Sequence, residues 1–358
     1  MRTGLVGTPI RLRRATELTV RRAVPEGELV DSARRRSSFW EEQGLATKEA
    51  LIKAVRIRNP EGFEGIDGLH FEDAPDPTPS VGDAVVQVRA ASFTPTELMW
   101  PLWTDRNGHH RHTMIPAHEG SGVVVALGYG TAGVDVGDEV FGLIDGYRDG
   151  WAAEYVTIEA RSLAAMPKSV DFVEAAALPQ AGLTSWQALF HHGKLETGQT
   201  VLIHGAGGGV GSTGVQLATW AGARVIGTGR ANARARVLDL GADEFVDVEQ
   251  EGWEKSVDPV DLVYDIIGSD VLARSDAVVK SGGAIVSIMS PCPTERTDIR
   301  TVHFVRDANG SQLREIARLV DEGVVTPQVS AVYPLSDARK AFMDKSTQHL
   351  PGKVVLTP

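Results

Sequence analysis

The hydrophobic pattern differs between the two halves of the chain. The first half contains short apolar runs that are typical of strands, and the second half alternates such runs with longer stretches of helical period. From Lys53 to about residue 170, brief apolar runs are separated by Gly, Pro and Asp, which is the pattern of an all-β unit. These runs predict strands at 53–57, 84–90, 122–126, 138–141 and 153–156.

The pattern changes near Asp171, beyond which helix-period and strand-like runs alternate. Helices are expected at 173–178, 184–190, 210–221, 231–240, 271–279 and 312–321. Strands are expected at 201–203, 224–227, 245–248, 261–266, 284–288 and 302–305. This alternation predicts a doubly wound parallel sheet, and a last apolar run at 352–356 is expected to return to the β unit as a strand.

A glycine-rich stretch directly follows the buried strand expected at 201–203. Glycine permits a tight turn at the strand end and brings bare amides to a phosphate, toward which the following helix points its positive dipole end. Small residues at 211, 214 and 218 share one helix face, so the helix can pack closely on the strand. The stretch predicts a dinucleotide site, and an ordinary loop is the alternative. Its residues are Gly205, Gly207, Gly208, Gly209, Val210 and Gly211.

Size, composition and charge narrow the protein class. A chain of 358 residues is long enough for two domains, and 42% hydrophobic with 23% charged residues is typical of globular proteins. A net charge of −11 argues against nucleic acid and anionic membranes as partners. The single cysteine, Cys292, excludes an intramolecular disulfide framework and a cysteine-rich zinc site. No apolar run approaches the roughly 20 residues that cross a bilayer. We therefore expect a cytoplasmic protein with a small-molecule substrate.

Residues 1–52 differ in composition from the rest of the chain. They carry many arginines, including the run 34–36, and they contain no apolar core of a secretory signal. We expect a poorly ordered N-terminal extension. An organellar transit peptide and a partner-binding arm are the alternatives.

An all-β half, an alternating half and a glycine loop follow one another along the chain. In this order they resemble the medium-chain dehydrogenase/reductase superfamily and, within it, the zinc-independent quinone oxidoreductase-like branch. The motifs that carry the resemblance are PAHEGSGV at 116–123, VGDEVFG at 136–142, WAAEYV at 151–156, ALPQAGLTSWQAL at 177–189, the glycine loop, LGAD at 240–243 and GKV at 352–354. The resemblance implies a GroES-like β-barrel catalytic domain (53–172 and 324–358) and a Rossmann NADP-binding domain (173–323). It also implies a homodimer, with cofactor and substrate held between the two domains.

The resemblance indicates which residues of this chain would have to bind a catalytic zinc ion. Zinc enzymes of this superfamily use two cysteines and a histidine, and the corresponding positions here are near Thr94, Ala181 and His118. A hydroxyl and a methyl group cannot replace two thiolates. The histidines at 109, 110 and 112 are an alternative metal-binding tract, but they stand in what reads as a solvated loop. We predict a protein without a catalytic metal.

The end of the second Rossmann strand predicts the nicotinamide cofactor. NAD enzymes place an acidic residue there, whereas this chain has Gly229 followed by Arg230, with Arg234 and Arg236 on the next helix. Guanidinium groups can bind a 2′-phosphate that a carboxylate would repel, so NADP is predicted. A solvated helix face is the alternative reading of these arginines. Thr184, expected at a helix N-terminus, and Thr228 complete the candidate cofactor-binding set.

Without a metal, an already electrophilic acceptor is the expected substrate. A quinone or an α,β-unsaturated carbonyl accepts hydride at carbon, and the charge left on oxygen needs a donor or water. The resemblance places Thr94 and Trp100 in the substrate site, where Trp100 would floor an aromatic pocket; a buried structural tryptophan is the alternative. Tyr147 is a candidate proton donor, and a surface turn is the alternative for its segment. The leading hypothesis is an NADPH-dependent quinone or enone reductase. An enoyl-thioester reductase and a non-catalytic NADPH-binding protein are the alternatives.

Overall fold

The computed structural model describes residues 51–58, 65–100, 103–348 and 350–358. The chain divides into residues 1–46 and 47–358, and the description below concerns the second unit. The predicted N-terminal extension lies outside the described residues except for its end. Leu51 and Ile52 already belong to the first strand, β1 (Leu51–Arg58), so this strand begins earlier than predicted.

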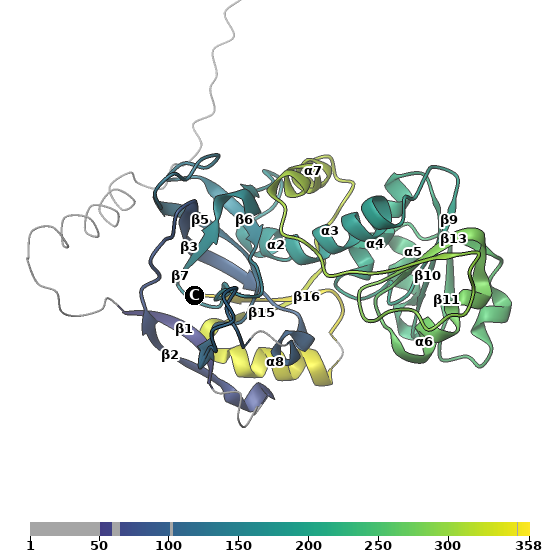
Figure 1. Ribbon diagram of the computed structural model, residues 1–358, viewed down its shortest axis with the longest axis horizontal. Helices are drawn as coiled ribbons and strands as arrows, with labels where there is room; N and C mark the ends of the chain where they lie inside the picture. Colours follow the sequence, from purple (N-terminus) through teal and green to yellow (C-terminus); the bar gives the residue numbers. More distant parts are fainter. Residues whose placement is uncertain (1–50, 59–64, 101–102, 349) are drawn as a thin grey trace, which may run out of the picture. The chain divides into compact units, whose positions relative to one another are not determined.

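The first half of this unit is all-β, as its sequence pattern predicts (Figure 1). A small sheet has the order β2-β1-β4, and a seven-stranded sheet has the order β15-β16-β3-β5-β6-β8, with β7 paired to β3. Their bounds are β2 (Leu69–Pro75), β3 (Asp83–Ser92), β4 (Thr113–Met114), β5 (Glu119–Leu127), β6 (Glu139–Leu143), β7 (Tyr155–Glu159), β8 (Leu163–Ala165), β15 (Val329–Pro334) and β16 (Lys353–Thr357).

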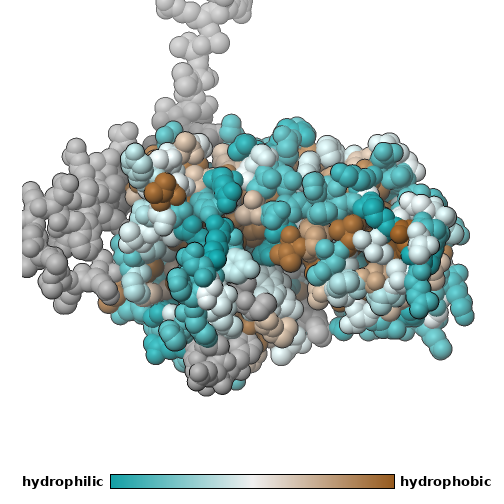
Figure 2. Space-filling model, viewed as in Figure 1, coloured by the Kyte–Doolittle hydropathy of each residue, from teal (hydrophilic) through white to brown (hydrophobic). Residues whose placement is uncertain are grey.

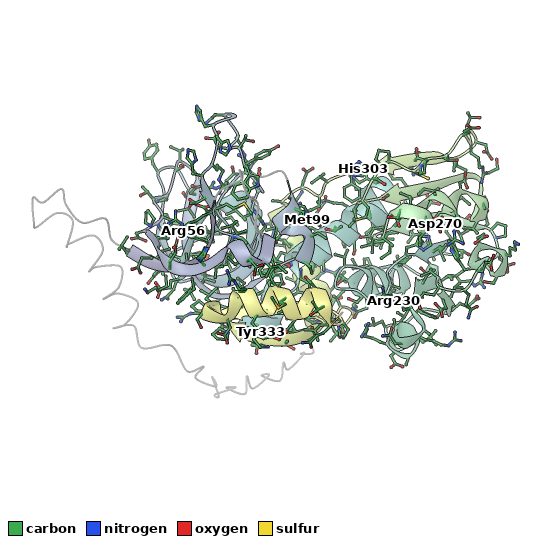
Figure 3. All side chains as sticks on the ribbon, turned by 90° about the horizontal axis from the view of Figure 1, so that it is seen from below. Arg56, Met99, Arg230, Asp270, His303 and Tyr333 are labelled. Carbon is green, nitrogen blue, oxygen red and sulfur yellow. The ribbon has the colours of Figure 1, made fainter. Side chains whose placement is uncertain are left out.

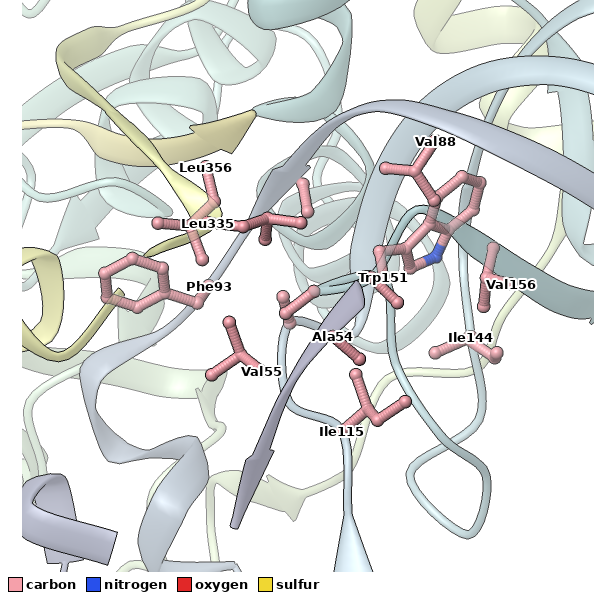
Figure 4. Packing of buried hydrophobic residues seen from close by; sticks show 14 of the residues in the cluster. Ala54, Val55, Val88, Phe93, Ile115, Ile144, Trp151, Val156, Leu335 and Leu356 are labelled. Atoms are coloured by element: carbon pink, nitrogen blue, oxygen red, sulfur yellow. The ribbon is translucent and has the colours of Figure 1, made fainter. Parts of the chain in front are cut away.

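Alternating side chains of these strands fill one hydrophobic core. Trp151 is fully buried, and the rings of Phe93 and Phe342 stack with centroids 3.7 Å apart. Figure 4 shows Trp151 beside Val88 and Val156 in this core. Phe342 comes from α8 (Ala338–Thr347), a C-terminal helix that therefore belongs to the β unit.

The C-terminal strand returns to the β unit, which confirms the prediction for the apolar run at 352–356. β16 pairs in parallel with β15 and antiparallel with β3, where Val355 stands opposite Ser92 and Leu356 opposite Ala91. The last residues of the chain therefore lie beside a strand that is some 260 positions earlier in the sequence.

The second half is a six-stranded parallel sheet of order β11-β10-β9-β12-β13-β14, as predicted for a Rossmann domain. Its bounds are β9 (Thr200–Ile203), β10 (Arg224–Gly229), β11 (Glu244–Asp247), β12 (Val260–Asp265), β13 (Val279–Ser287) and β14 (Arg300–His303). Consecutive side chains of β9 point to opposite faces. Val201 and Ile203 enter one apolar core, and Leu202 enters the other. Both faces are covered, which explains the continuous apolar runs.

Helices of the second half contribute to the two apolar cores on either side of this sheet. α3 (Pro179–Trp186), α4 (Gly211–Trp220), α5 (Arg234–Asp239) and α7 (Gly310–Asp321) contribute to one core, and α6 (Ser269–Ala273) to the other. Figure 1 shows α3 and α4 along one side of the sheet. None of the helices within the described ranges is long and apolar enough to cross a bilayer. The face seen in Figure 2 is largely hydrophilic, with hydrophobic residues in separate small patches.

Three predicted helices have different boundaries in the structure. The helix expected at 271–279 is only α6 (Ser269–Ala273), followed by a 3₁₀ turn at Ser275–Val278, and Val279 already begins β13. The segment expected at 173–178 is the short helix α2 (Phe172–Ala176), capped by the Asp171 carboxylate, which accepts from the Glu174 amide. The helix expected at 184–190 begins earlier, at Pro179, because proline fits the first turn, and it continues into a π-helix, Gln187–His192. Ala176 and Ala177 pack with Ala90 and Val355 of the β unit. The predicted domain boundaries stay predictions.

Candidate functional site

The glycine loop connects β9 to α4 as a tight turn that other residues cannot form. Gly205 has a φ of +69°, and its carbonyl accepts from the Gly208 amide at 2.9 Å. A Cβ on Gly211 would lie 2.2 Å from the Gly205 carbonyl oxygen, so the first residue of α4 must also be glycine. A Cβ on Gly214 would stand 3.1 Å from the Tyr264 ring, which confirms the close helix–strand packing expected from the small residues.

Gly208 and Gly209 differ in how much space a side chain would find at each position. A Cβ on Gly208 would meet only the Gly205 carbonyl oxygen, at 3.2 Å, within 4 Å among the described residues. A Cβ on Gly209 would clash with Lys353 Cδ at 2.8 Å. The missing side chain at Gly208, whose amide already donates to the Gly205 carbonyl, therefore leaves room for a pyrophosphate beside the N-terminus of α4, where the helix dipole favours negative charge.

Three cationic side chains converge on the loop. Arg236 Nη2 donates to the Gly207 carbonyl at 2.7 Å. A backbone bridge joins Gly208 to Gly352, and Lys345 donates to the Gly352 carbonyl at 2.6 Å. Lys353 follows in the chain and is buried. This positive charge suits a dinucleotide phosphate.

The lysines belong to a buried polar network. Lys353 Nζ forms an ion pair with the Glu119 carboxylate and lies 3.3 Å from the Phe93 carbonyl. Glu119 Oε2 also accepts from the Gln180 amide at 2.8 Å. Burial first, and then the charges of Lys353 and Arg236, lower the pKa of Lys345 to about 8. Sequence reasoning missed both lysines, because they are more than 130 positions from the glycine loop.

Thr228 does not offer its side chain to a ligand. Its hydroxyl is buried and lies 2.8 Å from His204 Nδ1, and its carbonyl accepts from the Ala206 amide at 2.9 Å. Thr228 therefore holds the start of the glycine loop through its backbone carbonyl and its hydroxyl. Its predicted contact with the cofactor stays a prediction.

His204, which sequence reasoning did not single out, is buried directly after β9, where the glycine loop begins. Its Nε2 lies 2.9 Å from the Ser275 hydroxyl, which itself donates to the Val271 carbonyl at 2.7 Å. Ser275 therefore accepts from Nε2–H, and Nδ1 accepts from Thr228. Burial lowers the pKa of His204 to about 4 against the opposing charge of Asp265. A neutral imidazole thus ties β9 to β10.

The predicted 2′-phosphate residues lie at the end of β10. Arg230 forms a 3.3 Å ion pair with Glu249, and both side chains are more than half exposed (Figure 3). Arg234 Nη1 donates to the Phe245 carbonyl at 3.2 Å, and its guanidinium lies 5.9 Å from that ring centroid. Gly229 leaves the strand end without a carboxylate. Their role in cofactor binding stays a prediction.

Thr184 is not at a helix N-terminus, because α3 already begins at Pro179. The side chain is buried, and its Oγ1 has no hydrogen-bond partner within the described ranges. An orphaned buried hydroxyl is costly in a folded protein unless a ligand completes it. The unpaired hydroxyl is consistent with the predicted cofactor contact. The helix N-terminus from which that contact was predicted is, however, at Pro179 and not at Thr184.

His118, which the resemblance aligns with a zinc ligand of related enzymes, lies beside a carboxylate. His118 and Glu97 are both buried, and His118 Nδ1 lies 3.7 Å from Glu97 Oε2. Glu97 Oε1 accepts from the Ala117 amide at 2.6 Å, and Oε2 accepts from the Thr94 amide at 3.3 Å. Thr94 thus caps the short 3₁₀ turn at Pro95–Met99. Within the residues that the structure describes, no three His, Cys, Asp or Glu side chains form a metal-binding group.

Trp100 lies between this pair and an arginine that sequence reasoning missed. Its ring centroid is 5.8 Å from that of His118, and the Arg306 guanidinium carbon is 4.8 Å from the indole centroid. Arg306 Nε donates to Gln180 Oε1 at 2.9 Å. Burial lowers the pKa of Arg306, opposed chiefly by the charges of Glu97 and Glu119. The structure therefore brings Thr94 and Trp100 together beside an unforeseen cation.

Tyr147 lies elsewhere on the β unit. Its side chain is 46% exposed and lines a pocket of about 510 Å³ that residues of β1, β2 and β7 also border. Neither the glycine loop nor Trp100 borders that pocket. The structure thus does not bring Tyr147 together with the other candidate residues, and its role as proton donor stays a prediction.

Two family models match the chain. Residues 80–168 match the alcohol dehydrogenase GroES-like domain, and residues 240–356 match the zinc-binding dehydrogenase family. These matches fall on the all-β unit and on the second half of the parallel sheet with the C-terminal strands.

Relatives and solved structures agree with the two models. The chain is 31% identical to 2-methylene-furan-3-one reductase of Solanum lycopersicum over 76% of this chain and 71% of that protein. It is 30% identical to NADPH-dependent alkenal/one oxidoreductase, chloroplastic, of Arabidopsis thaliana over 83% of this chain and 78% of that protein. The quinone oxidoreductase of Coxiella burnetii superposes with a TM-score of 0.79 at 28% identity, covering 86% and 100% of the two chains. The chain is therefore an oxidoreductase-family protein of the medium-chain dehydrogenase/reductase superfamily, in its quinone oxidoreductase-like branch.

Proposed function

We propose that this chain catalyses NADPH-dependent reduction of a quinone or an α,β-unsaturated carbonyl compound without a metal. The observation that carries the proposal has two parts. The glycine loop can accommodate a phosphate, and the two positions that correspond to the cysteine ligands of related zinc enzymes hold residues without a thiolate. Thr94 caps a turn, and Ala181 is buried and apolar. The reduced nicotinamide supplies a hydride, and this chain's residues bind, orient and stabilise charge. The named activities of the tomato and Arabidopsis relatives support the same acceptor class.

NADPH rather than NADH is proposed from the end of β10. Gly229 presents no carboxylate, and the exposed Arg230 guanidinium can exchange its Glu249 partner for a 2′-phosphate, since an exposed ion pair is worth at most about 1 kcal/mol.

Replacing Arg230 tests this choice. Arg230→Ala should weaken NADPH binding by about 1.5–3 kcal/mol, the usual worth of a hydrogen bond to a charged group, and leave NADH binding unchanged. Fluorescence titration of both cofactors measures the two losses. Arg224→Ala, at the other end of β10 and also in an exposed ion pair, is the matched control. Equal losses for the two cofactors would show that Arg230 does not bind the 2′-phosphate.

The activity is tested with a panel of acceptors. Simple quinones, alkenals and crotonyl thioesters are supplied with NADPH, and cofactor oxidation is followed beside elemental analysis for zinc. We expect turnover of quinones or alkenals and less than stoichiometric zinc. Turnover of thioesters alone would favour an enoyl-thioester reductase, and binding of NADPH without turnover would favour a sensor or structural protein. One zinc per chain would contradict the metal-free proposal.

A homodimer and cytoplasmic residence are also proposed. The dimer is supported by the unpaired outer edge of β14 in the described sheet. The relatives include a protein named as chloroplastic, so imaging of the full chain with its basic N-terminal residues is the test of location.

A further inference from the structure

The segment that carries Arg306 is held firmly by the helix opposite. The Gln187 side chain accepts from the Asp307 amide at 2.9 Å and donates to the Asp307 carbonyl at 2.9 Å. The Phe304 ring lies 4.4 Å from that of His192, centroid to centroid. Arg306 stands between these two anchors, so its backbone is fixed on both sides.

The Arg306 side chain is fixed as well. Gln180 accepts from Nε, and the guanidinium carbon lies 4.8 Å from the centroid of the Trp100 ring. Within the described residues, the terminal Nη groups form no hydrogen bond of their own, so they remain available as donors. A donor held in this way loses little entropy when it meets a ligand.

No carboxylate neutralises this guanidinium directly. Within the described part of the chain, Arg306 forms no ion pair. Four acids act on it through their charge alone. Glu97 accepts from backbone amides, Glu119 pairs with Lys353, Asp145 pairs with Arg106, and Asp307 is the next residue in the chain. A half-buried guanidinium without a carboxylate partner is costly, and such groups concentrate at functional sites.

The position in the fold is that of a ligand-binding residue. Arg306 follows β14, the glycine loop follows β9, and Arg230 follows β10, so all three lie beyond the carboxyl ends of strands in one parallel sheet. In open α/β sheets, ligands bind at this edge.

We propose that Arg306 binds the acceptor oxygen on which negative charge develops during reduction. This inference rests on the proposed function and deepens it, because it restricts the acceptor to a planar conjugated carbonyl compound or quinone that can lie against Trp100. An enone that takes a hydride at its β carbon forms a C–H bond there. Its C=C π pair moves to the bond between the α carbon and the carbonyl carbon, and the C=O π pair moves to oxygen. The bond that breaks is a C–H bond of the reduced nicotinamide, so NADPH becomes NADP⁺. The α carbon then takes a proton from water, which leaves as hydroxide, and the electron pair on oxygen re-forms the C=O bond.

Arg306 acts in this step by hydrogen-bonding the oxygen as it becomes an enolate or a phenolate. The interaction is stronger with the anion than with the neutral carbonyl, so it lowers the barrier rather than merely improving binding. It also supplies the stabilisation for which Tyr147 was the sequence-based candidate, and water can deliver the proton.

The kinetic test replaces Arg306 with methionine and with lysine. Arg306→Met should lower kcat/KM for an alkenal by about 10²–10³-fold, the usual loss of one oxyanion donor, with NADPH affinity unchanged. Arg306→Lys keeps the charge but not the forked donors, so its kcat/KM should lie between those of the parent enzyme and Arg306→Met. Arg314→Met, an exposed arginine on α7, is the matched control and should match the parent enzyme.

A binding test provides a readout that does not depend on turnover. 4-Nitrophenol is a planar conjugated acid whose phenolate absorbs in the visible region, so the pKa of the bound molecule can be read directly in the presence of NADP⁺. The parent protein and Arg314→Met should stabilise the bound phenolate and lower its pKa. Arg306→Met should lose this shift, and Arg306→Lys should restore part of it.

The two tests separate this inference from the proposed function. If no acceptor of the panel is reduced but the phenolate shift depends on Arg306, the reductase proposal fails and the anion site stands. If alkenals are reduced and Arg306→Met changes neither kcat/KM nor the phenolate shift, the inference is overturned. A misfolded Arg306→Met protein would be recognised by its loss of NADPH binding, and Arg306→Lys then decides the outcome.

Discussion

At the scale of single residues, a buried neutral histidine makes stability depend on pH. His204 links the glycine-loop strand to Thr228, and its pKa is about 4 in the folded chain against about 6.5 in the unfolded one. The unfolded state therefore binds more protons between these values, so stability is full above pH 6.5 and falls as the pH drops toward 4. Between pH 7.5 and 5 this group should remove about 2 kcal/mol of unfolding free energy. Urea denaturation of the parent and of His204→Gln, which keeps a donor and an acceptor without titrating, measures the difference. Parallel pH profiles of the two proteins would contradict the assignment.

At the scale of an element, the strand–loop–helix unit 200–220 combines two kinds of glycine. Gly205 and Gly211 are required by the fold, whereas Gly208 leaves its backbone bare. Gly208→Val should therefore abolish NADPH binding through steric exclusion of the pyrophosphate, while the melting temperature stays within about 2 °C of the parent's. Ala235→Val on the exposed side of α5 adds a branched side chain without approaching the loop and is the control. Isothermal titration and calorimetry provide the two measurements. Unaltered NADPH affinity in Gly208→Val would show that the phosphate does not bind at this loop.

At the scale of the whole molecule, the outer edge of β14 predicts how two copies meet. β14 pairs only with β13 in the described sheet, and an unpaired strand edge favours pairing with another chain. His303 at its end is exposed (Figure 3). Light scattering should give the mass of two chains for the parent protein. Thr301→Lys places like charges opposite each other across a two-fold axis and should shift the protein toward monomers, whereas Thr347→Lys on α8 should not. A parental mass for Thr301→Lys would place the dimer contact elsewhere, and a monomeric parent would contradict the homodimer.

The sequence by itself determined the fold class, the order of the strands' apolar runs and the position of the glycine loop. These features are local: the period of apolar residues distinguishes strand from helix, and glycines between a strand and a helix mark a phosphate turn. The family motifs were equally readable, and the comparisons confirm the family. Several helix boundaries differ from those predicted. The start at Pro179 and the π-helix after Trp186 depend on capping and packing, which the period of apolar residues does not record.

Only the tertiary structure decided which distant residues share the site. Lys353 meets the Glu119 carboxylate because β16 pairs with β3, which in turn pairs with β5. Arg306 lies 4.8 Å from the Trp100 ring centroid although it follows a strand of the other sheet. Tyr147 looked equally plausible in the sequence, yet it lines a different pocket. A side chain's residue type reveals what chemistry it can perform, but whether it meets a substrate depends on strand order and long-range packing, which no local pattern along the chain encodes.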